Sequence, residues 1–336
     1  MDNLLGMYTV IGCILTLLMW YYPISTIQEG KSMLYVKEGG VLIKLDNWEQ
    51  VYTRPNYVVD IDSKGKVLNE VFGYYKNEPS RACGLKNCHA GHKKGFIVRT
   101  EDGLETCIGH ICGTTIFEEK FEVLAQRMES EVNLEIYKET VASKKQKVFE
   151  YWQQAAELTS GPNGILKLAE KIEQIKDPLV VGRYAATELS RMASNRDTKV
   201  LSPQSVPKDK NEYNNPAEDA PIEYKTVFVV IGQIQQIEIL ASDNSLRELY
   251  EKEISQVLTA LENVDLNAIS RRQLTNIGRR ASMLDARIAR AKELQESAIK
   301  FLRKKNLKPL YHQMFPMDNV SRKDLGLYND FINSLK

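Results

Sequence analysis

The chain has 336 residues, and its 45 basic and 44 acidic side chains give a net charge of only +1. A charge this balanced argues against whole-chain attraction to nucleic acid or to anionic lipid. The composition, 43% hydrophobic and 26% charged, excludes a disordered, collagenous or multi-span membrane chain. The length favours two domains over one.

The N-terminal segment is long, apolar and uncharged. No charged residue occurs in residues 3–28, and residues 4–27 would form about 36 Å of helix, enough to cross a bilayer. Residues 1–3 offer no basic side chain, which argues against a cleaved signal peptide. Three lysines follow the segment closely and none precedes it. We therefore predict a single-pass inner-membrane protein, anchored by residues 1–30, with its body in the cytoplasm.

Residues 31–80 are predicted to form a small antiparallel sheet. Short β-rich runs at Met33–Val36, Val41–Ile43 and Tyr57–Val59 are separated by residues that favour turns, including Gly39-Gly40 and Asp62–Gly65. Such alternation of strand and turn is typical of a small antiparallel sheet.

Residues 81–116 hold a dense group of potential metal ligands on either side of a predicted hairpin. The hairpin consists of alternating Phe96, Val98 and Thr100, a turn at Asp102-Gly103, and a returning strand. Because a hairpin brings its two ends together, ligands that flank it converge. The group contains four cysteines and three histidines, namely Cys83, Cys88, His89, His92, Cys107, His110 and Cys112.

Thiolate and imidazole are the ligands that zinc prefers, usually four in a tetrahedron. From their spacing we predict a zinc-ribbon-like module in which Zn²⁺ is bound by Cys83, Cys88, His92 and Cys112. The alternates are His89, Cys107 and His110. A closed structural site is favoured over a catalytic one, although the acids Glu101, Asp102 and Glu105 of the hairpin are candidate bases for a zinc hydrolase.

The run from Cys88 to Gly113 resembles a group of uncharacterised bacterial and prophage proteins. The matching positions are Cys88, His92, the strand Gly95–Arg99 and the knuckle Ile108-Gly109 and Cys112-Gly113. Four residues separate Cys83 from Cys88, where that group has two. The tail of the group is also similar to Ala298–Leu302 and the following Asn306-Leu307. The resemblance implies no activity, but it implies a phage-related or host-defence context.

The rest of the chain is predicted to be mainly helical, so the fold class is α+β and predominantly helical. Residues 117–194 are predicted to be helical, with a long amphipathic helix from Ile116 to Leu158 followed by two shorter helices at residues 163–176 and 178–194. Residues 195–222 carry four prolines and few apolar side chains, which predicts a flexible linker. Residues 223–308 begin with a strand and continue as helices at Leu246–Leu261 and Ala268–Leu302. Residues 309–336 form a C-terminal tail.

Charge is segregated along the chain. Residues 101–160 hold 12 acidic and six basic side chains, whereas residues 266–308 hold 12 basic and three acidic ones. On one helical face the basic residues form a stripe consisting of Arg272, Arg279, Arg280, Arg287 and Arg290. The stripe is expected to pair with the acidic helix at residues 118–139 or to lie in solvent. Binding to an acidic partner, lipid headgroups or nucleic acid is the alternative.

We therefore expect a membrane-anchored, zinc-stabilised adaptor with an unknown protein partner, and self-association into a homo-oligomer is a further option. The alternatives are a membrane-tethered nucleic-acid-binding protein, which would use the zinc module and the basic stripe, and a zinc hydrolase. The sequence shows none of the common phosphate-binding, dinucleotide-binding or hydrolase motifs, which disfavours an ordinary enzyme.

Overall fold

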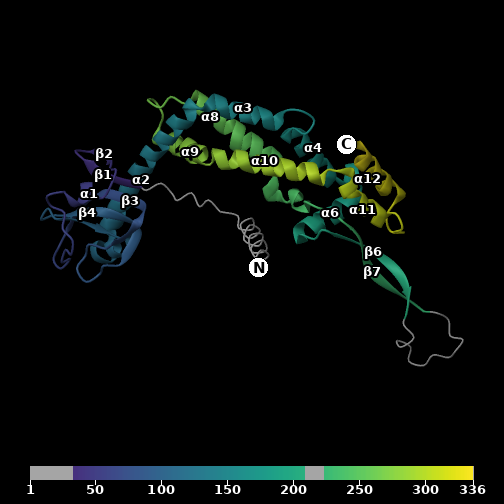
Figure 1. Cartoon of the computed structure of the whole chain (residues 1–336), viewed down its shortest axis with the longest axis horizontal. Helices are drawn as coiled ribbons and strands as arrows, with labels where there is room; N and C mark the ends of the chain where they lie inside the picture. Colours follow the sequence, from purple (N-terminus) through teal and green to yellow (C-terminus); the bar gives the residue numbers. More distant parts are fainter. Residues whose placement is uncertain (1–32, 209–222, 336) are drawn as a thin grey trace, which may run out of the picture. The chain divides into compact units, whose positions relative to one another are not determined.

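A computed structural model of the chain describes residues 33–208 and 223–335 (Figure 1). These residues form two compact units, which meet between Glu135 and Ile136 inside a long helix. The N-terminal unit contains a β-sheet, and the C-terminal unit is mainly helical. The boundary therefore lies well before the predicted linker at residues 195–222.

The described part of the N-terminal unit contains an antiparallel sheet of five strands in the order β2-β1-β3-β4-β5. A short helix, α1 (Glu49–Tyr52), follows the first hairpin. The strands are β1 (Met33–Glu38), β2 (Val41–Lys44), β3 (Leu68–Ala82), β4 (Gly91–Thr100) and β5 (Glu105–Ile108). The hairpin predicted around Asp102-Gly103 is present as β4 and β5, and Gly103 has the positive φ of 88° that its turn requires.

The third strand of the sheet differs from the prediction. Residues 57–59 form no strand, and Tyr57 makes only an isolated bridge to Glu105. The central strand is instead β3, whose register against β4 shifts at three places. The first two shifts add one residue to β3 and the third, between Lys76 and Arg81, adds three. Each of these odd shifts inverts the alternation of inward and outward side chains, which hides the strand from a search for period two.

Both faces of the sheet are covered. On one face Trp48 and Val51 of the α1 region pack with Phe72, Tyr75 and other buried side chains of the sheet. On the other face the ring of Phe96 meets that of Phe121, at right angles and 5.5 Å away. Phe121 belongs to α2 (His110–Gln146), whose buried residues recur every three or four positions, at Phe117, Phe121, Ala125, Met128 and Val132.

The long helix predicted from Ile116 to Leu158 is interrupted twice. Glu118 has non-helical backbone angles (φ 50°, ψ −140°), which separate the first two turns of α2 from the rest. A second break at Lys147 ends α2 and begins α3 (Val148–Thr159). The first turns of α2 are thus a distinct segment beside the end of β5.

The C-terminal unit packs its helices around α10 (Leu284–Phe301), which contacts α3, α4 (Ile165–Lys176) and α9 (Arg271–Ser282) among others (Figure 1). The predicted helices at 178–194 and 268–302 are each divided, at Gly182 and Met283 respectively. The helical elements after α3 in the described residues are α4 (Ile165–Lys176), α5 (Pro178–Val181), α6 (Arg183–Asn195), η2 (Ile237–Leu240), η3 (Ser242–Asn244), α7 (Leu246–Glu248), the π-helix η4 (Leu249–Ser255), α8 (Gln256–Asn263), α9 (Arg271–Ser282), α10 (Leu284–Phe301), α11 (Lys304–Met314) and α12 (Arg322–Ser334).

Part of the predicted linker is a β-ribbon. β6 (Lys199–Pro207) pairs with β7 (Tyr224–Gln233), and Figure 1 shows this ribbon extending from the helices of its unit. Pro203 and Pro207 are tolerated because every strand of a two-stranded ribbon is an edge strand. The ribbon explains why residues on both sides of the predicted linker belong to one unit. The remainder of that linker, residues 209–222, lies outside the described residues.

The membrane prediction needs correction. In residues 33–208 and 223–335, no helix combines the length and the apolar character that crossing a bilayer requires. The two longest of these helices, α2 and α10, carry charged side chains along most of their length. A fold with a transmembrane helix and a location as a single-pass inner-membrane protein are therefore not supported. The segment that prompted both predictions, residues 4–27, lies outside the described residues.

Candidate metal centre

Three cysteine thiols converge at one end of the sheet. Cys83 follows β3, Cys88 lies in the next turn, and Cys112 is in the first turn of α2. Their three Sγ atoms all lie within 4.8 Å of one another, and those of Cys88 and Cys112 are 3.3 Å apart. Cys83 is buried, whereas Cys88 is exposed and Cys112 is partly exposed.

Backbone hydrogen bonds shape the loop that carries the first two thiols. The amide of Cys83 donates to the carbonyl of Ala90 (3.0 Å), which closes the loop between β3 and β4. The amide of Gly84 donates to the carbonyl of Cys107 (2.8 Å), which fastens the same loop to β5. A Cβ atom at position 84 would lie 1.9 Å from Oγ1 of Thr106, so this close approach requires glycine.

The environment affects each thiol differently. Burial raises the pKa of Cys83 to about 12, and a hydrogen bond from the backbone of Leu85 opposes this rise. A hydrogen bond from the backbone of Ala90 lowers the pKa of Cys88. Burial and the neighbouring Cys88 raise the pKa of Cys112. Amide groups directed at sulfur two residues earlier favour the thiolate form, which is the form that binds metals.

These three thiols could hold a metal ion. They come from two segments that are distant in sequence, so a bound ion would join the loop after β3 to the start of α2. The sequence prediction of ligands at Cys83, Cys88 and Cys112 thus corresponds to three side chains that the fold brings together.

The two neighbouring histidines lie outside this group of thiols. His92 places Nδ1 3.1 Å from the carbonyl oxygen of Ala90, and its Nε2 hydrogen-bonds with the hydroxyl of Tyr75. His89 has a left-handed backbone (φ 48°), and its Nδ1 lies 3.3 Å from Oδ1 of Asp60. Both rings are close in sequence to Cys88, but each has a partner other than the thiols.

The other two alternative ligands, Cys107 and His110, pack against hydrophobic side chains of the N-terminal unit. Cys107 is buried in the hydrophobic cluster around Trp48, and its Sγ lies 3.5 Å from the carbonyl oxygen of Ala82. The ring of His110 lies 5.9 Å from that of Phe121 and 6.3 Å from that of Phe96. These contacts give both residues a packing role.

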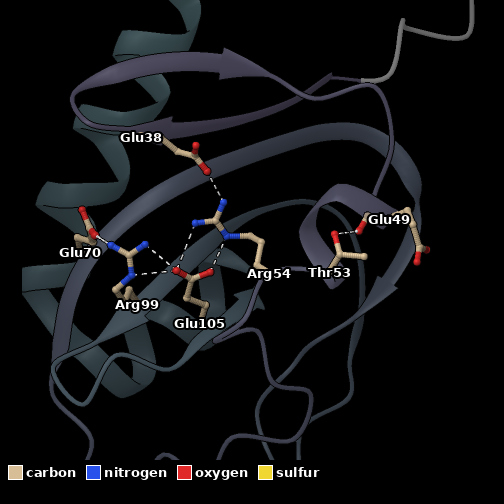
Figure 2. Close-up of polar contacts among 7 residues, drawn as sticks. All are labelled: Glu38, Glu49, Thr53, Arg54, Glu70, Arg99 and Glu105. Carbon is tan, nitrogen blue, oxygen red and sulfur yellow. Dashed lines mark hydrogen bonds and ion pairs between the residues drawn. The ribbon is translucent and has the colours of Figure 1, made fainter.

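A buried ion cluster surrounds Glu105, as Figure 2 shows. Its side chain is only 3% exposed, and its carboxylate accepts hydrogen bonds from Nε of Arg54 (2.6 Å) and from a terminal nitrogen of Arg99 (2.6 Å). The two guanidinium groups also lie over the ring of Phe72, at 5.0 and 4.6 Å from its centroid. Arg54 in turn binds Glu38, and Arg99 binds Glu70.

This cluster was not predicted from the sequence, which proposed Glu105 only as a base. The sequence could have predicted one ion pair of this cluster. Arg99 and Glu105 flank the Asp102-Gly103 turn and therefore face each other across the hairpin. Arg54 comes from a loop far away in sequence, and no pattern indicated its position. A carboxylate held by two arginines is a structural group and is not free to accept a proton from water.

The basic stripe is largely occupied by contacts within the C-terminal unit. Arg280 donates to the carbonyl of Lys252, Arg287 lies 3.6 Å from Glu253, and Arg290 donates to Asn244 (2.7 Å). Arg272 and Arg279 are exposed on α9. The expected pairing with the acidic helix at residues 118–139 is thus replaced, for these three arginines, by partners nearer the C-terminus.

Comparison with protein-family models, with curated proteins and with solved structures found no match. The resemblance to bacterial and prophage proteins therefore stays an expectation. Functional inference for this chain rests on the geometry described above.

Proposed function

We propose that this chain is a zinc-stabilised interaction protein, in which one zinc ion fixes the structure of the N-terminal unit. The observation that carries the proposal is the convergence of three Sγ atoms within 4.8 Å. Free thiols that merely pack in a core have no reason to gather from separate segments around one point. Zinc is the favoured ion because it prefers thiolate ligands in a compact tetrahedral site.

We assign the fourth ligand position to His92. A metal-bound histidine commonly uses one ring nitrogen for the metal and donates from the other to a backbone carbonyl. The Nδ1 of His92 already faces the carbonyl of Ala90, so Nε2 is the nitrogen that would exchange the Tyr75 hydroxyl for zinc. Four protein ligands would close the site, which suits a structural ion.

The role in protein contact is supported by the β-ribbon of the C-terminal unit. β7 exposes Tyr224, Phe228 and Val230, with Phe228 69% exposed. Among the described residues no third strand pairs with either outer edge of this two-stranded ribbon. An extended segment of a protein partner could add to such an edge as a further strand.

Neither alternative function is favoured by a comparable observation. Three of the five stripe arginines are engaged within their own unit, and the candidate base Glu105 is held by two arginines. Both alternatives would need groups that are already occupied.

The zinc site can be tested by measuring the metal content of the full chain after purification under reducing conditions. The wild type should carry about one zinc per chain. Cys112→Ser should lose most of it, whereas the matched variant Cys107→Ser should keep it, since Cys107 lies outside the group of thiols. A wild type with less than about a tenth of an equivalent of zinc, which is far below saturation of a site of the usual affinity, would refute the proposal.

A further inference from the structure

A pocket of about 520 Å³ lies in the C-terminal unit, between the ends of α4 and α6 and the residues around η2. Its volume is in the range of sites that hold small organic molecules. The lining residues are Ile175, Lys176, Ala186, Leu189, Ser190, Ala193, Ser194, Arg196, Leu240, Ala241 and Ser242.

The floor and the rim of this pocket differ in chemistry. The floor consists of buried apolar side chains, including Ile175, Leu189 and Leu240. The rim consists of exposed polar groups, which are the ammonium of Lys176, the guanidinium of Arg196 and the hydroxyls of three serines. A molecule seated here would meet an apolar surface below and hydrogen-bond donors above.

The rim carries positive charge, and no acidic side chain lines the pocket beside it. The lining contains two cations and no carboxylate. Within residues 33–208 and 223–335, the side chains of Lys176 and Arg196 form no ion pair or hydrogen bond. The acids nearest to Lys176 in sequence are Asp177 and Glu173. Oδ1 of Asp177 accepts a hydrogen bond from the backbone amide of Leu179 (2.8 Å). The carboxylate of Glu173 is bound by Arg247 at 2.8 and 3.0 Å and attracts Lys176 only at longer range.

Two other pockets provide a comparison. In the pocket lined by Lys37, Arg99 and Arg127, each of these cations is paired with a glutamate. In the pocket lined by Lys252, Arg287 and Arg290, each cation is likewise paired with a glutamate. The pocket between α4 and α6 differs from both because its cations have no such partner.

We propose that this pocket binds a small organic anion with an apolar body, whose charged group lies between Lys176 and Arg196 and whose hydrocarbon part covers Ile175, Leu189 and Leu240. Charge-assisted hydrogen bonds from an ammonium and a guanidinium are stronger than neutral ones, and both cations would gain them from the ligand. The serine hydroxyls of the rim would supply further donors. This site is independent of the zinc centre.

The test is a calorimetric titration of the full chain with octanoate and with octyl phosphate, which share an anionic head and an eight-carbon chain. Saturable binding of at least one of them is expected, with one molecule bound per chain. The double variant Lys176→Gln and Arg196→Gln should raise its dissociation constant at least about tenfold, the loss expected for a charge-assisted contact.

A matched control neutralises two exposed cations of the same unit that do not line the pocket, as Arg183→Gln and Lys199→Gln. Its dissociation constant should equal that of the wild type. Circular dichroism establishes that both double variants are folded. Absence of saturable binding of both probes, equal binding by the Lys176 and Arg196 variant, or equally tight binding of uncharged octanol would overturn the proposal.

Discussion

Glu105 is a buried carboxylate whose charge depends on two arginines. Desolvation of a lone carboxylate at 3% exposure would be unfavourable, and only the hydrogen bonds from Arg54 and Arg99 make the charged form acceptable there. The arginines are themselves partly exposed, at 17% and 29%, so water screens the cluster from one side. Removing one member leaves the others incompletely paired.

We expect Glu105→Gln to reduce the free energy of unfolding of the N-terminal unit by about 2–3 kcal/mol, the lower end of the cost of breaking a buried pair because the arginines are partly solvated. Urea unfolding can be followed by the emission of Trp48 in a background of Trp20→Phe and Trp152→Phe. Glu101→Gln, an exposed acid of the same hairpin, is the control. Equal free energies of unfolding for Glu105→Gln and Glu101→Gln would show that the ion cluster does not stabilise the N-terminal unit.

The contribution of Glu105 to the free energy of unfolding should depend on pH. Burial alone would raise the pKa of Glu105, but hydrogen bonds from Arg54 and Arg99 outweigh it and hold the pKa below its ordinary value of 4.5. A group whose pKa is lowered by folding contributes stability that is complete above the unfolded value and is lost as the pH falls through the folded value. The stability difference between wild type and Glu105→Gln should therefore be constant near neutral pH and shrink below about 4.5. A difference that grows on acidification would contradict this assignment.

The first turns of α2 form the element on which the candidate metal centre most depends. They carry Cys112, and the non-helical backbone at Glu118 separates them from the rest of α2. Gly113 sits against the ring of Phe121, where an added Cβ atom would approach the ring to 2.3 Å. This close packing holds the start of α2 against the sheet and so fixes the position of Cys112.

Gly113→Ala should therefore weaken zinc binding although it changes no ligand. The added methyl group has to displace either the Phe121 ring or the helix segment that bears Cys112, and overpacking of this kind typically costs about 1–3 kcal/mol. Competition with a chromophoric chelator measures the affinity. Gly326→Ala, at a helical position with open space, is the control and should leave zinc affinity unchanged. Unchanged affinity in Gly113→Ala would mean that Phe121 does not position Cys112.

The sequence allowed some elements to be predicted well and others not at all. The β4–β5 hairpin followed from Asp102-Gly103 and the alternation before it, because a tight turn and its strands are local features. β3 was not predicted because its register shifts break the alternation of inward and outward side chains. β6 was mistaken for a linker because its two prolines are typical of loops, and only pairing with β7 shows that they lie on an edge.

The candidate metal site was likewise predictable only in part. Clustering of cysteines between Cys83 and Cys112 indicated a metal site, since thiols from both ends of a hairpin converge. Which residues face one another depends on the loop geometry between β3 and β4 and on the break in α2, and spacing alone does not determine these. The ion cluster around Glu105 needed Arg54, a contact between residues 51 positions apart.

In the whole molecule, the near-neutral net charge conceals a strongly basic segment at residues 266–308. Several charged side chains of this segment form ion pairs within the C-terminal unit. Arg287 and Arg290 face acids of the C-terminal unit, and Asp285 of the same helix binds Lys144. Each of these ion pairs joins residues of the C-terminal unit, whereas the proposed zinc ion belongs to the N-terminal unit.

Removal of zinc should therefore loosen one unit and spare the other. A structural metal binds the folded state and not the unfolded chain, so a chelator lowers stability where the metal is bound. Hydrogen exchange of the full chain with and without EDTA should show faster exchange in residues 83–92 and 107–113 and no change in α10. Equal acceleration in α10 would show that the two units are coupled.

The most direct measurement of the central claim is X-ray absorption at the zinc edge of the full chain. The proposed site predicts a first coordination shell of three sulfur atoms at about 2.3 Å with one nitrogen at about 2.0 Å. In Cys112→Ser the residual zinc, if any, should show fewer sulfur neighbours. A shell of oxygen and nitrogen only, or one sulfur in the wild type, would contradict binding by Cys83, Cys88 and Cys112.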